Sequence, residues 1–371
     1  MSNKLLAYWD HFVWKTDKVA RFCKSINGKM LGIVSTLIVC CAVVSLLGTD
    51  ALKNIPIIKS TYYDTIVANF PKFVDFLSAD IGKVVFLIAL LGVCICYSFR
   101  KWYHPFATLI AHSTMGYDLS VLHEPLKKSF WFIRKYVGEQ LPSSNASEEQ
   151  VIAAVYAQDE SFKQIQGSNW CSTVFYYGIA HTPLVFRLGY QWGQTRGIRF
   201  LHRFRSTEDK QEFKELPQYV EEKMSFLRSD RLDAPNYNLK SKHLLVSIAT
   251  TYPIKNEDLL SIDPSNAMLR YDMQVDMMGY DFFNSYQKIR SYADRIVDDL
   301  RKMVKERGIE TIHFVISSSV PFTFYLAQQM NTHQFCKIIV YHFDHGKYTW
   351  GIDVTEPEAG KAIRWVGCVK N

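Results

Sequence analysis

The sequence predicts an α/β protein made of two related halves, which follow two membrane-spanning helices. Three observations lead to this prediction. From about residue 105 onward, short apolar runs typical of buried strands alternate with helical stretches. Residues 311–350 have a degenerate copy 138 residues upstream. Two long apolar runs precede this region. A repeat of this length predicts a binding module with internal pseudo-symmetry.

The two apolar runs lie within the first hundred residues. Residues 30–47 contain no charged side chain, and residues 83–99 contain only Lys83 at one edge. About 20 apolar residues are needed to cross a bilayer core of about 30 Å. We therefore predict membrane helices at 30–48 and 81–99, an amphipathic segment at 1–29 and an outer loop at 49–80. A buried core helix or a signal peptide is the alternative, but the basic segment before the first run is long for a signal peptide.

Basic residues predict the orientation of these spans. Lysine and arginine are frequent in residues 1–29, and Arg100 and Lys101 directly follow the second run, whereas the loop at 49–80 has more aspartate than lysine. Cytoplasmic flanks carry an excess of basic residues. Both termini are therefore expected in the cytoplasm. The net charge of +7 is explained in part by attraction of these flanks to anionic lipid, and does not by itself indicate nucleic-acid binding.

Strands and helices alternate in the remainder of the chain. The apolar runs predict strands at 107–111, 173–179, 197–204, 243–249, 311–316 and 337–343. Helices are predicted at 147–165, 181–192, 285–307 and 321–330. This order is typical of parallel sheets covered by helices. We place the first half at 105–207, a polar linker at 208–240 and the second half at 241–371.

The repeat indicates where a ligand would bind. It aligns Pro183 with Pro321 and residues 109–113 with 247–251, so a site is expected either twice or once between the halves. Ligands of open α/β sheets bind beyond the carboxyl ends of the strands. Four such ends are rich in hydroxyl and small side chains. The copies have diverged, since Ser317-Ser318-Ser319 corresponds to Ile179-Ala180-His181, and the two sides of a site are not expected to be equivalent.

Two of these loops lead into helices with proline in the first turn. Such a helix start offers free N–H groups and a positive dipole end to a phosphate. The alternative is that the polar residues only cap the helices. Arg205 ends a strand and could contact an anion, whereas Arg187 and the neighbouring arginines are expected on solvated faces. Tyr252 and Phe322 could stack on a nucleobase, with core packing as the alternative. The candidate ligand-binding residues are Ser113, Thr114, His181, Thr182, Arg205, Thr250, Thr251, Tyr252, Ser317, Ser318, Ser319 and Phe322.

Signatures of catalysis and of metal binding are missing from the sequence. It contains no GxxxxGK[ST], GxSxG or HExxH motif and no paired CxxC. His342, Asp344 and His345 follow one another closely, but no further ligand is evident. We predict no catalytic residue, no metal site, no cofactor and no enzymatic activity.

The stretch from Ile312-His313-Phe314 through Pro321 to Val340-Tyr341 resembles the SAVED domain, and residues 176–190 are its weaker counterpart. The resemblance covers roughly 105–371 and implies two fused CARF-like, Rossmann-like halves. The usual small residues before Pro321 are replaced by Ser317-Ser318-Ser319, which affects the expectation about the ligand and leaves the fold unchanged.

With two spans ahead of it, the chain resembles the transmembrane SAVED effectors of bacterial CBASS anti-phage defence. The resemblance implies a multi-pass protein of the inner membrane that binds a cyclic di- or trinucleotide as activating ligand. It also implies head-to-tail oligomerisation and membrane disruption that causes abortive infection. No DNA or RNA duplex is expected as a partner. The alternatives are a CARF-like ring nuclease that degrades cyclic oligoadenylate, a membrane effector linked to type III CRISPR, and a scaffold without ligand.

Overall fold

The computed structural model describes Leu91 and residues 106–366, apart from 118, 120–121, 123, 143, 168–172, 194–196, 206–211, 221–226, 230–240 and 331–334. Nearly all of these residues belong to one compact unit, Phe106–Asn371; the other unit is Met1–Pro105. The predicted segments at 1–29, 30–48, 49–80 and 81–99 lie outside the described residues, Leu91 excepted. Within the described part of the chain, no helix is both long and apolar enough to cross a bilayer.

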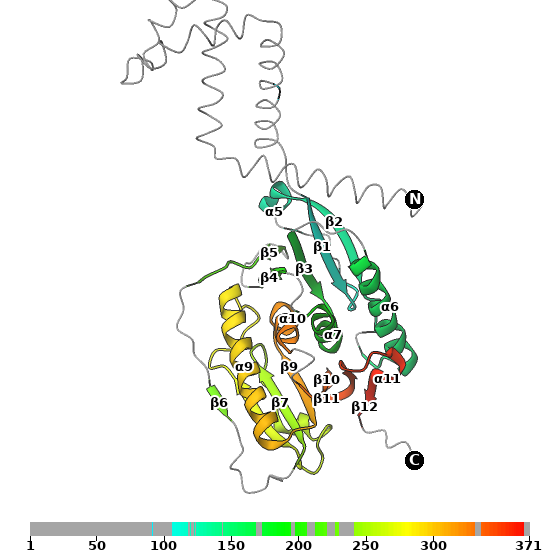
Figure 1. Ribbon diagram of the computed structural model, residues 1–371, viewed down its shortest axis with the longest axis vertical. Coiled ribbons are helices and arrows are strands. Elements are labelled where there is room, and N and C mark those ends of the chain that lie inside the picture. Colours follow the sequence, from blue (N-terminus) through cyan, green and yellow to red (C-terminus); the bar gives the residue numbers. More distant parts are fainter. Residues whose placement is uncertain are drawn as a thin grey trace, which may run out of the picture. The chain divides into compact units, whose positions relative to one another are not determined.

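The first of two mixed sheets has five strands in the order β2-β1-β3-β4-β5 (Figure 1). Its first four strands are parallel, and β5 is antiparallel to β4. Together with α5–α7, these strands make up what we call the first half. Its elements are β1 (Phe106–Ser113), α5 (Glu124–Ser129), β2 (Trp131–Val137), α6 (Glu148–Gly167), β3 (Thr173–Ile179), α7 (Thr182–Trp192), β4 (Arg199–Arg203) and β5 (Phe213–Glu215).

The second sheet has seven strands in the order β12-β11-β10-β9-β7-β8-β6. The central strands β10, β9, β7 and β8 are parallel. Strands β6 and β11 are antiparallel to their neighbours β8 and β10, and β12 is antiparallel to β11. With α8–α11 they form the second half. Its elements are β6 (Leu227–Ser229), β7 (His243–Ala249), α8 (Asn256–Leu259), β8 (Leu269–Gln274), α9 (Tyr286–Arg307), β9 (Thr311–Ser317), α10 (Val320–Gln329), β10 (Lys337–Asp344), β11 (Lys347–Asp353), α11 (Ala359–Ala362) and β12 (Ile363–Trp365).

The offset of 138 residues relates the two halves element by element. It places β3 on β9, α6 on α9 and α7 on α10 to within two residues at either end. The strand order β2-β1-β3-β4-β5 corresponds to β8-β7-β9-β10-β11 in the second sheet. Even the antiparallel register is shared, because Leu201 pairs with Glu215 and Ile339 pairs with Asp353. The predicted α/β fold is therefore confirmed, with mixed sheets in place of the purely parallel ones expected.

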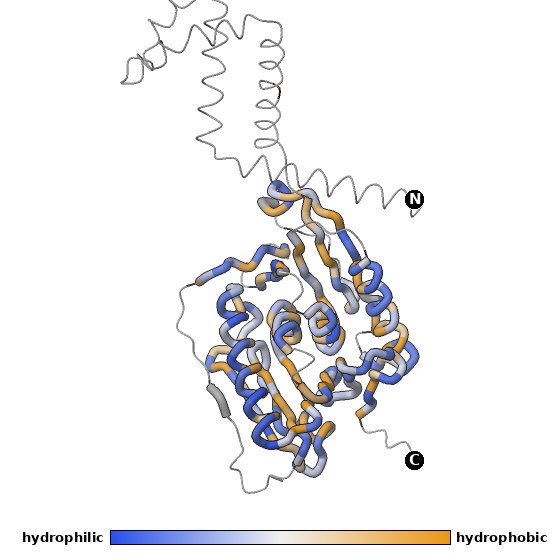
Figure 2. The backbone as a smooth tube through the Cα atoms, viewed as in Figure 1, coloured by the Kyte–Doolittle hydropathy of each residue, from blue (hydrophilic) through white to orange (hydrophobic). Residues whose placement is uncertain are grey.

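Helix α9 illustrates how local sequence sets the boundaries. Ser285 is its N-cap and accepts a hydrogen bond from the Lys288 backbone N–H at 3.3 Å. Gly308 ends it with a left-handed φ of 63°. Its buried residues recur at helical spacing. Figure 2 shows the outer helix as largely hydrophilic beside the apolar strands of the second sheet.

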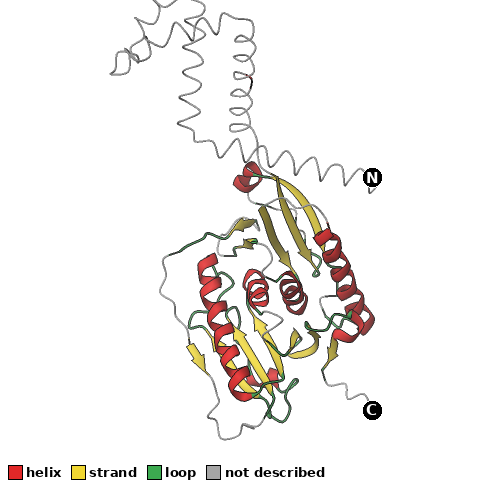
Figure 3. Ribbon diagram, in the orientation of Figure 1, coloured by secondary structure: helices red, strands yellow, loops and turns green. Residues whose placement is uncertain are grey.

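The halves are joined by α7 and α10, which lie side by side between the two groups of strands (Figure 3). Gly189 lets them approach, since a Cβ there would overlap the Phe324 carbonyl group. Each helix inserts a phenylalanine against an aromatic strand residue of the other half. Phe324 lies 4.1 Å from Tyr176 and Phe186 lies 5.2 Å from Phe314, as ring centroids. Residues of both halves thus belong to one continuous hydrophobic core.

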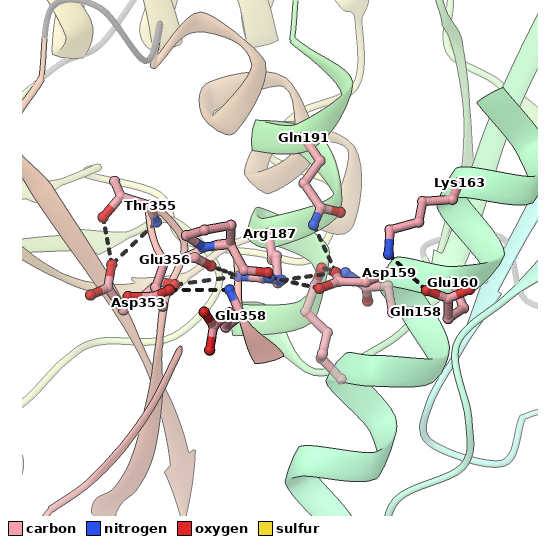
Figure 4. Close-up of polar contacts among 12 residues, drawn as sticks. Gln158, Asp159, Glu160, Lys163, Arg187, Gln191, Asp353, Thr355, Glu356 and Glu358 are labelled. Atoms are coloured by element: carbon pink, nitrogen blue, oxygen red, sulfur yellow. Dashed lines mark hydrogen bonds and ion pairs between the residues drawn. The ribbon is translucent and has the colours of Figure 1, made fainter. Parts of the chain in front are cut away.

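A buried arginine of the first half, Arg187, forms an ion pair there and also bonds to the segment at the end of β11 (Figure 4). The Arg187 guanidinium lies in the core, where it donates to both oxygens of Asp159 at 3.0 and 2.7 Å. It also donates to the backbone oxygens of Asp353 and Glu356 at 3.3 and 2.9 Å. The expectation that Arg187 lies on a solvated face is wrong, because helix packing surrounds its side chain with acceptors.

Candidate ligand-binding site

A cavity of about 260 Å³ lies where the two halves meet. Residues at the carboxyl ends of β3, β4 and β9 line it, as expected for open α/β sheets. Of the predicted residues, seven contribute to its wall: Thr182, Arg205, Thr251, Tyr252, Ser317, Ser318 and Ser319. The cavity is therefore a single site between the halves, one of the two arrangements that the repeat predicts.

The repeat relates the two sides of the cavity to each other. Residues Gly178, Ile179 and Ala180 on one side correspond, at the offset of 138, to Ile316, Ser317 and Ser318 on the other. The amino ends of α7 and α10 both border it, each with proline in the first turn. Neither His181 nor Ser319 caps its helix with its side chain. Simple capping therefore does not account for these two residues.

An arginine and two tyrosines form one wall. The Arg205 guanidinium carbon lies 3.6 Å from the centroid of the Tyr280 ring, and Tyr280 meets Tyr252 edge-to-face at 5.2 Å. The Tyr252 side chain is 54% exposed, so one aromatic surface stays accessible at the cavity. Asp281 holds the wall together, since it accepts hydrogen bonds from the Arg205 backbone N–H at 3.1 Å.

The charges of the cavity favour an anion. Arg203 and Arg205 line it together with His202, and no carboxylate is found among the described lining residues. The Asp281 carboxylate does not line the cavity, but it lies 3.2 Å from His202 Nε2. Arginine side chains beside hydroxyl groups and helix amino ends are suited to phosphate oxygens.

On the side of the cavity formed by the second half, the residues that directly follow β7 hold Ser317 and Ser318 in place. The Thr250 and Thr251 backbone N–H groups donate to the Ser317 carbonyl at 2.9 and 3.0 Å. The Tyr252 N–H donates to Ser317 Oγ at 3.0 Å, and Thr250 Oγ1 donates to Ser318 Oγ at 2.8 Å. Thr250 is itself buried and does not line the cavity. Thr250 contacts the lining residues Ser317 and Ser318 without lining the cavity itself.

Thr114 and His181 are buried behind the residues with which the first half lines the cavity. The His181 backbone N–H donates to Thr114 Oγ1 at 2.9 Å, and His181 Nδ1 lies 2.8 Å from the same oxygen. The His181 ring packs against His342 at 4.7 Å, and His342 packs against Trp350 at 4.9 Å. Burial lowers the pKa of His181 to about 4 and that of His342 to about 3. These side chains support the loop without lining the cavity.

Two further predicted residues lie elsewhere. Phe322 is fully buried and stacks on Phe283 with ring centroids 4.2 Å apart and planes 7° apart. It is core, so the expectation that it stacks on a base is not met by this structure. Ser113 Oγ donates to the Tyr117 carbonyl at 3.5 Å and lies outside the cavity lining.

Sequence reasoning missed Tyr280 and His202, and it wrongly expected Arg203 on a solvated face, whereas Arg203 lines the cavity. Tyr280 lies in an irregular segment between β8 and α9, where no periodicity marks it. His202 and Arg203 belong to a strand that was predicted, and only the fold shows that its end faces the second half. Among the described residues, no group of three or more potential ligands could hold a metal ion. His342, Asp344 and His345 do not form such a group.

Several solved structures and one family model are similar to this chain. No curated protein matches the sequence. Solved structures with a similar fold include the Acinetobacter baumannii Cap4 SAVED/CARF-domain containing receptor with the cyclic trinucleotide 3′3′3′-cAAA, at a TM-score of 0.46 and 12% identity, covering 71% of this chain and 54% of that chain. The same receptor with 2′3′3′-cAAA has a TM-score of 0.45 with the same identity and coverage. The Moraxella osloensis Cap4 receptor has a TM-score of 0.40 and 12% identity, covering 71% and 53%. The chain thus spans about half the length of these proteins.

A family model provides the assignment. It is described as the SMODS-associated and fused to various effectors sensor domain, and it matches residues 158–354, which is more than half of the chain. The match extends from α6 in the first half to the end of β11 in the second, and so includes both sides of the cavity. The chain belongs to the SAVED family.

Proposed function

We propose that this chain is a receptor for a cyclic oligonucleotide second messenger, bound in the cavity between the two halves. The cavity carries the proposal, because it combines arginines, hydroxyl groups and an accessible tyrosine at the junction of a pseudo-symmetric sensor domain. Arginines and hydroxyls suit the phosphodiester groups. Tyr252 offers a face on which a nucleobase stacks. A cyclic di- or trinucleotide contains both kinds of group.

We further propose that the receptor is the sensor of a CBASS membrane effector. The apolar runs at 30–48 and 81–99, with their basic flanks, support an inner-membrane protein whose sensor lies in the cytoplasm. Ligand binding would favour head-to-tail association of the sensors and bring the spans together. This requires a ligand that binds the associated state more tightly than the free state. Disruption of the membrane then stops growth of the infected cell.

Ligand binding is tested on the detergent-solubilised full chain. Cyclic di-, tri- and tetranucleotides, including 2′3′3′-cAAA and 3′3′3′-cAAA, are titrated by calorimetry. We expect at least one to bind, and Tyr252→Ala to weaken that binding about 5- to 100-fold, as expected for the loss of one base–aromatic stack. Tyr156→Ala is the matched control, because Tyr156 is similarly exposed but lies on α6 away from the cavity. Failure of every compound to bind the wild-type chain would refute the proposal.

The membrane effect is tested with the same chain reconstituted into dye-loaded vesicles. We expect the bound nucleotide to cause dye release, and Arg205→Ala to suppress it at the ligand concentration that activates the wild type. Dye release that does not depend on nucleotide, or binding without release, would contradict the membrane part and leave the receptor part standing.

We propose binding without turnover. Ligand recovered after prolonged incubation with the chain is expected to be intact by chromatography. Conversion to linear products would favour the ring-nuclease alternative, and His202 beside Asp281 would then be the first residue to replace.

A further inference from the structure

His181 lies between two residues that line the cavity but does not line it itself. Its neighbours Ala180 and Thr182 both contribute to the wall, whereas His181 is only 1% exposed. Each residue adds only two soft backbone dihedrals, so neighbouring residues of a short loop move together. The groups that hold the His181 side chain therefore decide where Ala180 and Thr182 lie.

Thr114, which directly follows β1, provides the polar part of this hold. Thr114 Oγ1 accepts a hydrogen bond from the His181 backbone N–H at 2.9 Å and lies 2.8 Å from His181 Nδ1. The Thr114 backbone N–H donates to the Ile179 carbonyl at 3.3 Å. Thr114 is thereby bonded to both ends of the segment 179–181. These bonds fix the backbone and one nitrogen of the imidazole, and the ring itself is packed by other groups.

His342, in the second half, packs against the His181 ring. The ring centroids are 4.7 Å apart and the planes meet at 71°, which is an edge-to-face contact. Trp350 lies 4.9 Å from His342 and 6.1 Å from His181, again between ring centroids. His342 and Trp350 are paired directly across β10 and β11. The three rings thus form a continuous contact between the loop at the cavity and the β10–β11 hairpin.

The hairpin is attached to the first half at a second point. The pairing register shifts between His342 and Phe343, and irregularities of this kind re-aim the side chains of a strand. Phe343 is 46% exposed, whereas Asp344 is buried. Asp344 Oδ2 accepts a hydrogen bond from the backbone N–H of Asn145, just before α6, at 2.9 Å. With both contacts in place, His342 has a fixed position relative to the first half.

We propose that His342 is a positioning residue of the ligand cavity, and that it holds Ala180 and Thr182 in the wall through the His181 ring. His342 is not among the residues that line the cavity, so it acts without touching the ligand. The first half's side of the cavity then depends on a side chain of the second half. This inference rests on the proposed function for the identity of the ligand, but the position of the wall can be examined without one.

Hydrogen exchange of the full chain without nucleotide tests whether His342 holds the wall. The reporter is the His181 amide, which donates to Thr114 Oγ1, and the reference is the Tyr176 amide in the middle of β3. We expect His342→Ala to raise the exchange rate of His181 relative to Tyr176 about 3- to 10-fold, the loss of one aromatic contact. A loss of global stability alone would accelerate both amides equally, and would overturn the positioning role.

Two further variants make this test specific. His342→Phe keeps an aromatic ring, as Phe204 does at the equivalent position of the repeat, and is expected to restore the wild-type ratio. His313→Ala is the matched control, because His313 is also a buried imidazole stacked on an aromatic ring of the second sheet, but near the amino end of β9. The same acceleration of His181 in His313→Ala as in His342→Ala would overturn the proposal.

His342 must act through His181, and a double-mutant cycle measures this. Once His181→Ala is present, His342→Ala is expected to have no further effect on exchange of the amide of residue 181. Additive effects would show that His342 acts by another route. Thermal unfolding of each variant checks that it is folded.

Titration with 3′3′3′-cAAA connects the wall to binding. If this nucleotide binds the wild type, His342→Ala is expected to weaken it about 3- to 10-fold, and His342→Phe to bind within about twofold of the wild type. Equal affinity of His342→Ala and the wild type would overturn the role of His342 in binding and leave the receptor standing. If the His181 amide responds as expected but no cyclic nucleotide binds, the hold on the wall stands and the receptor falls.

Discussion

Arg187 is a buried charge whose hydrogen bonds reach two separate parts of the chain. Asp159 on α6 neutralises it, and backbone oxygens near the end of β11 accept its remaining donors. Gln191 donates to Asp159 at 2.7 Å and completes the cluster. The charge is tolerated because its partners are fixed by packing, and removal of either member leaves the other unpaired in the core.

We expect Arg187→Met to lower the free energy of unfolding by about 3 kcal/mol, because Asp159 would remain buried without its cation. Denaturant titration of the full chain measures the change. The matched control is Arg290→Met, which removes an exposed pair with Asp294 at 3.4 Å and is expected to cost less than about 0.5 kcal/mol. Equal losses in the two variants would contradict this account.

Four imidazoles are kept neutral by the fold. Burial lowers the pKa of His112 and His342 to about 3, and the pKa of His181 and His313 to about 4. Each has a pKa of about 6.5 in the unfolded chain. Between these values the unfolded state binds more protons, so the stability from neutral imidazoles is complete above about pH 6.5 and declines as the pH falls.

We therefore expect the free energy of unfolding at about pH 5.5 to be lower than at about pH 7.5, by roughly 1 kcal/mol for each of the four histidines. Denaturant titrations at the two pH values provide the measurement. His342→Phe removes one titrating group and should make the pH dependence shallower. Stability that is unchanged over this range would show that the imidazoles are not held neutral.

At the scale of secondary-structure elements, the close packing of α7 against α10 depends on one glycine, Gly189. A Cβ at Gly189 would overlap the Phe324 carbonyl group and lie 3.0 Å from Ala327 Cβ. Residue 327 is the repeat equivalent of residue 189, so small residues occur at corresponding positions of both helices. The close approach allows each phenylalanine to reach the aromatic strand residue of the other half.

Gly189→Ala is expected to destabilise the protein by about 1–3 kcal/mol, because the helices must separate, although alanine is the better helix former by about 1 kcal/mol. Thermal unfolding detects the change. Gly360→Ala in α11 is the control, since a Cβ there meets no atom within 4 Å. It should be neutral or slightly stabilising. A stable Gly189→Ala variant would mean that the helices can shift without loss.

For the molecule as a whole, the shared core predicts that the two halves unfold together. Tyr176 in β3 and Phe314 in β9 belong to the same hydrophobic cluster. Hydrogen exchange of the full chain should therefore give the same opening free energy for amides of β3 and β9. A bound cyclic nucleotide at 100 times its Kd should raise both values by about 2.7 kcal/mol. Protection of one strand alone would show that the halves open independently.

The amino-acid sequence alone predicts the strands β1, β3, β4, β7, β9 and β10, the helices α6, α7, α9 and α10, and the repeat that relates them. The strands are continuous apolar runs, and helix starts such as Ser285 and Pro321 are marked by local chemistry. The short strands β5, β6 and β12 carry no such pattern and exist because a neighbouring strand supplies their hydrogen bonds. The predicted residues Thr182, Thr251 and Ser317–Ser319 line the cavity because they lie at or just after the carboxyl ends of predicted strands.

Tertiary packing determines which polar residues face the cavity and which ones support it. Thr250 and Thr114 look like their neighbours in sequence, but both are buried by contacts with residues more than 60 positions away. Phe322 is in the core because α10 packs against the loop before α9. Tyr280 reaches Arg205 across the junction of the halves. Local patterns predict helices because helix hydrogen bonds are short-range, and they predict buried strands because these are apolar runs. The composition of the site depends on long-range packing that no local pattern records.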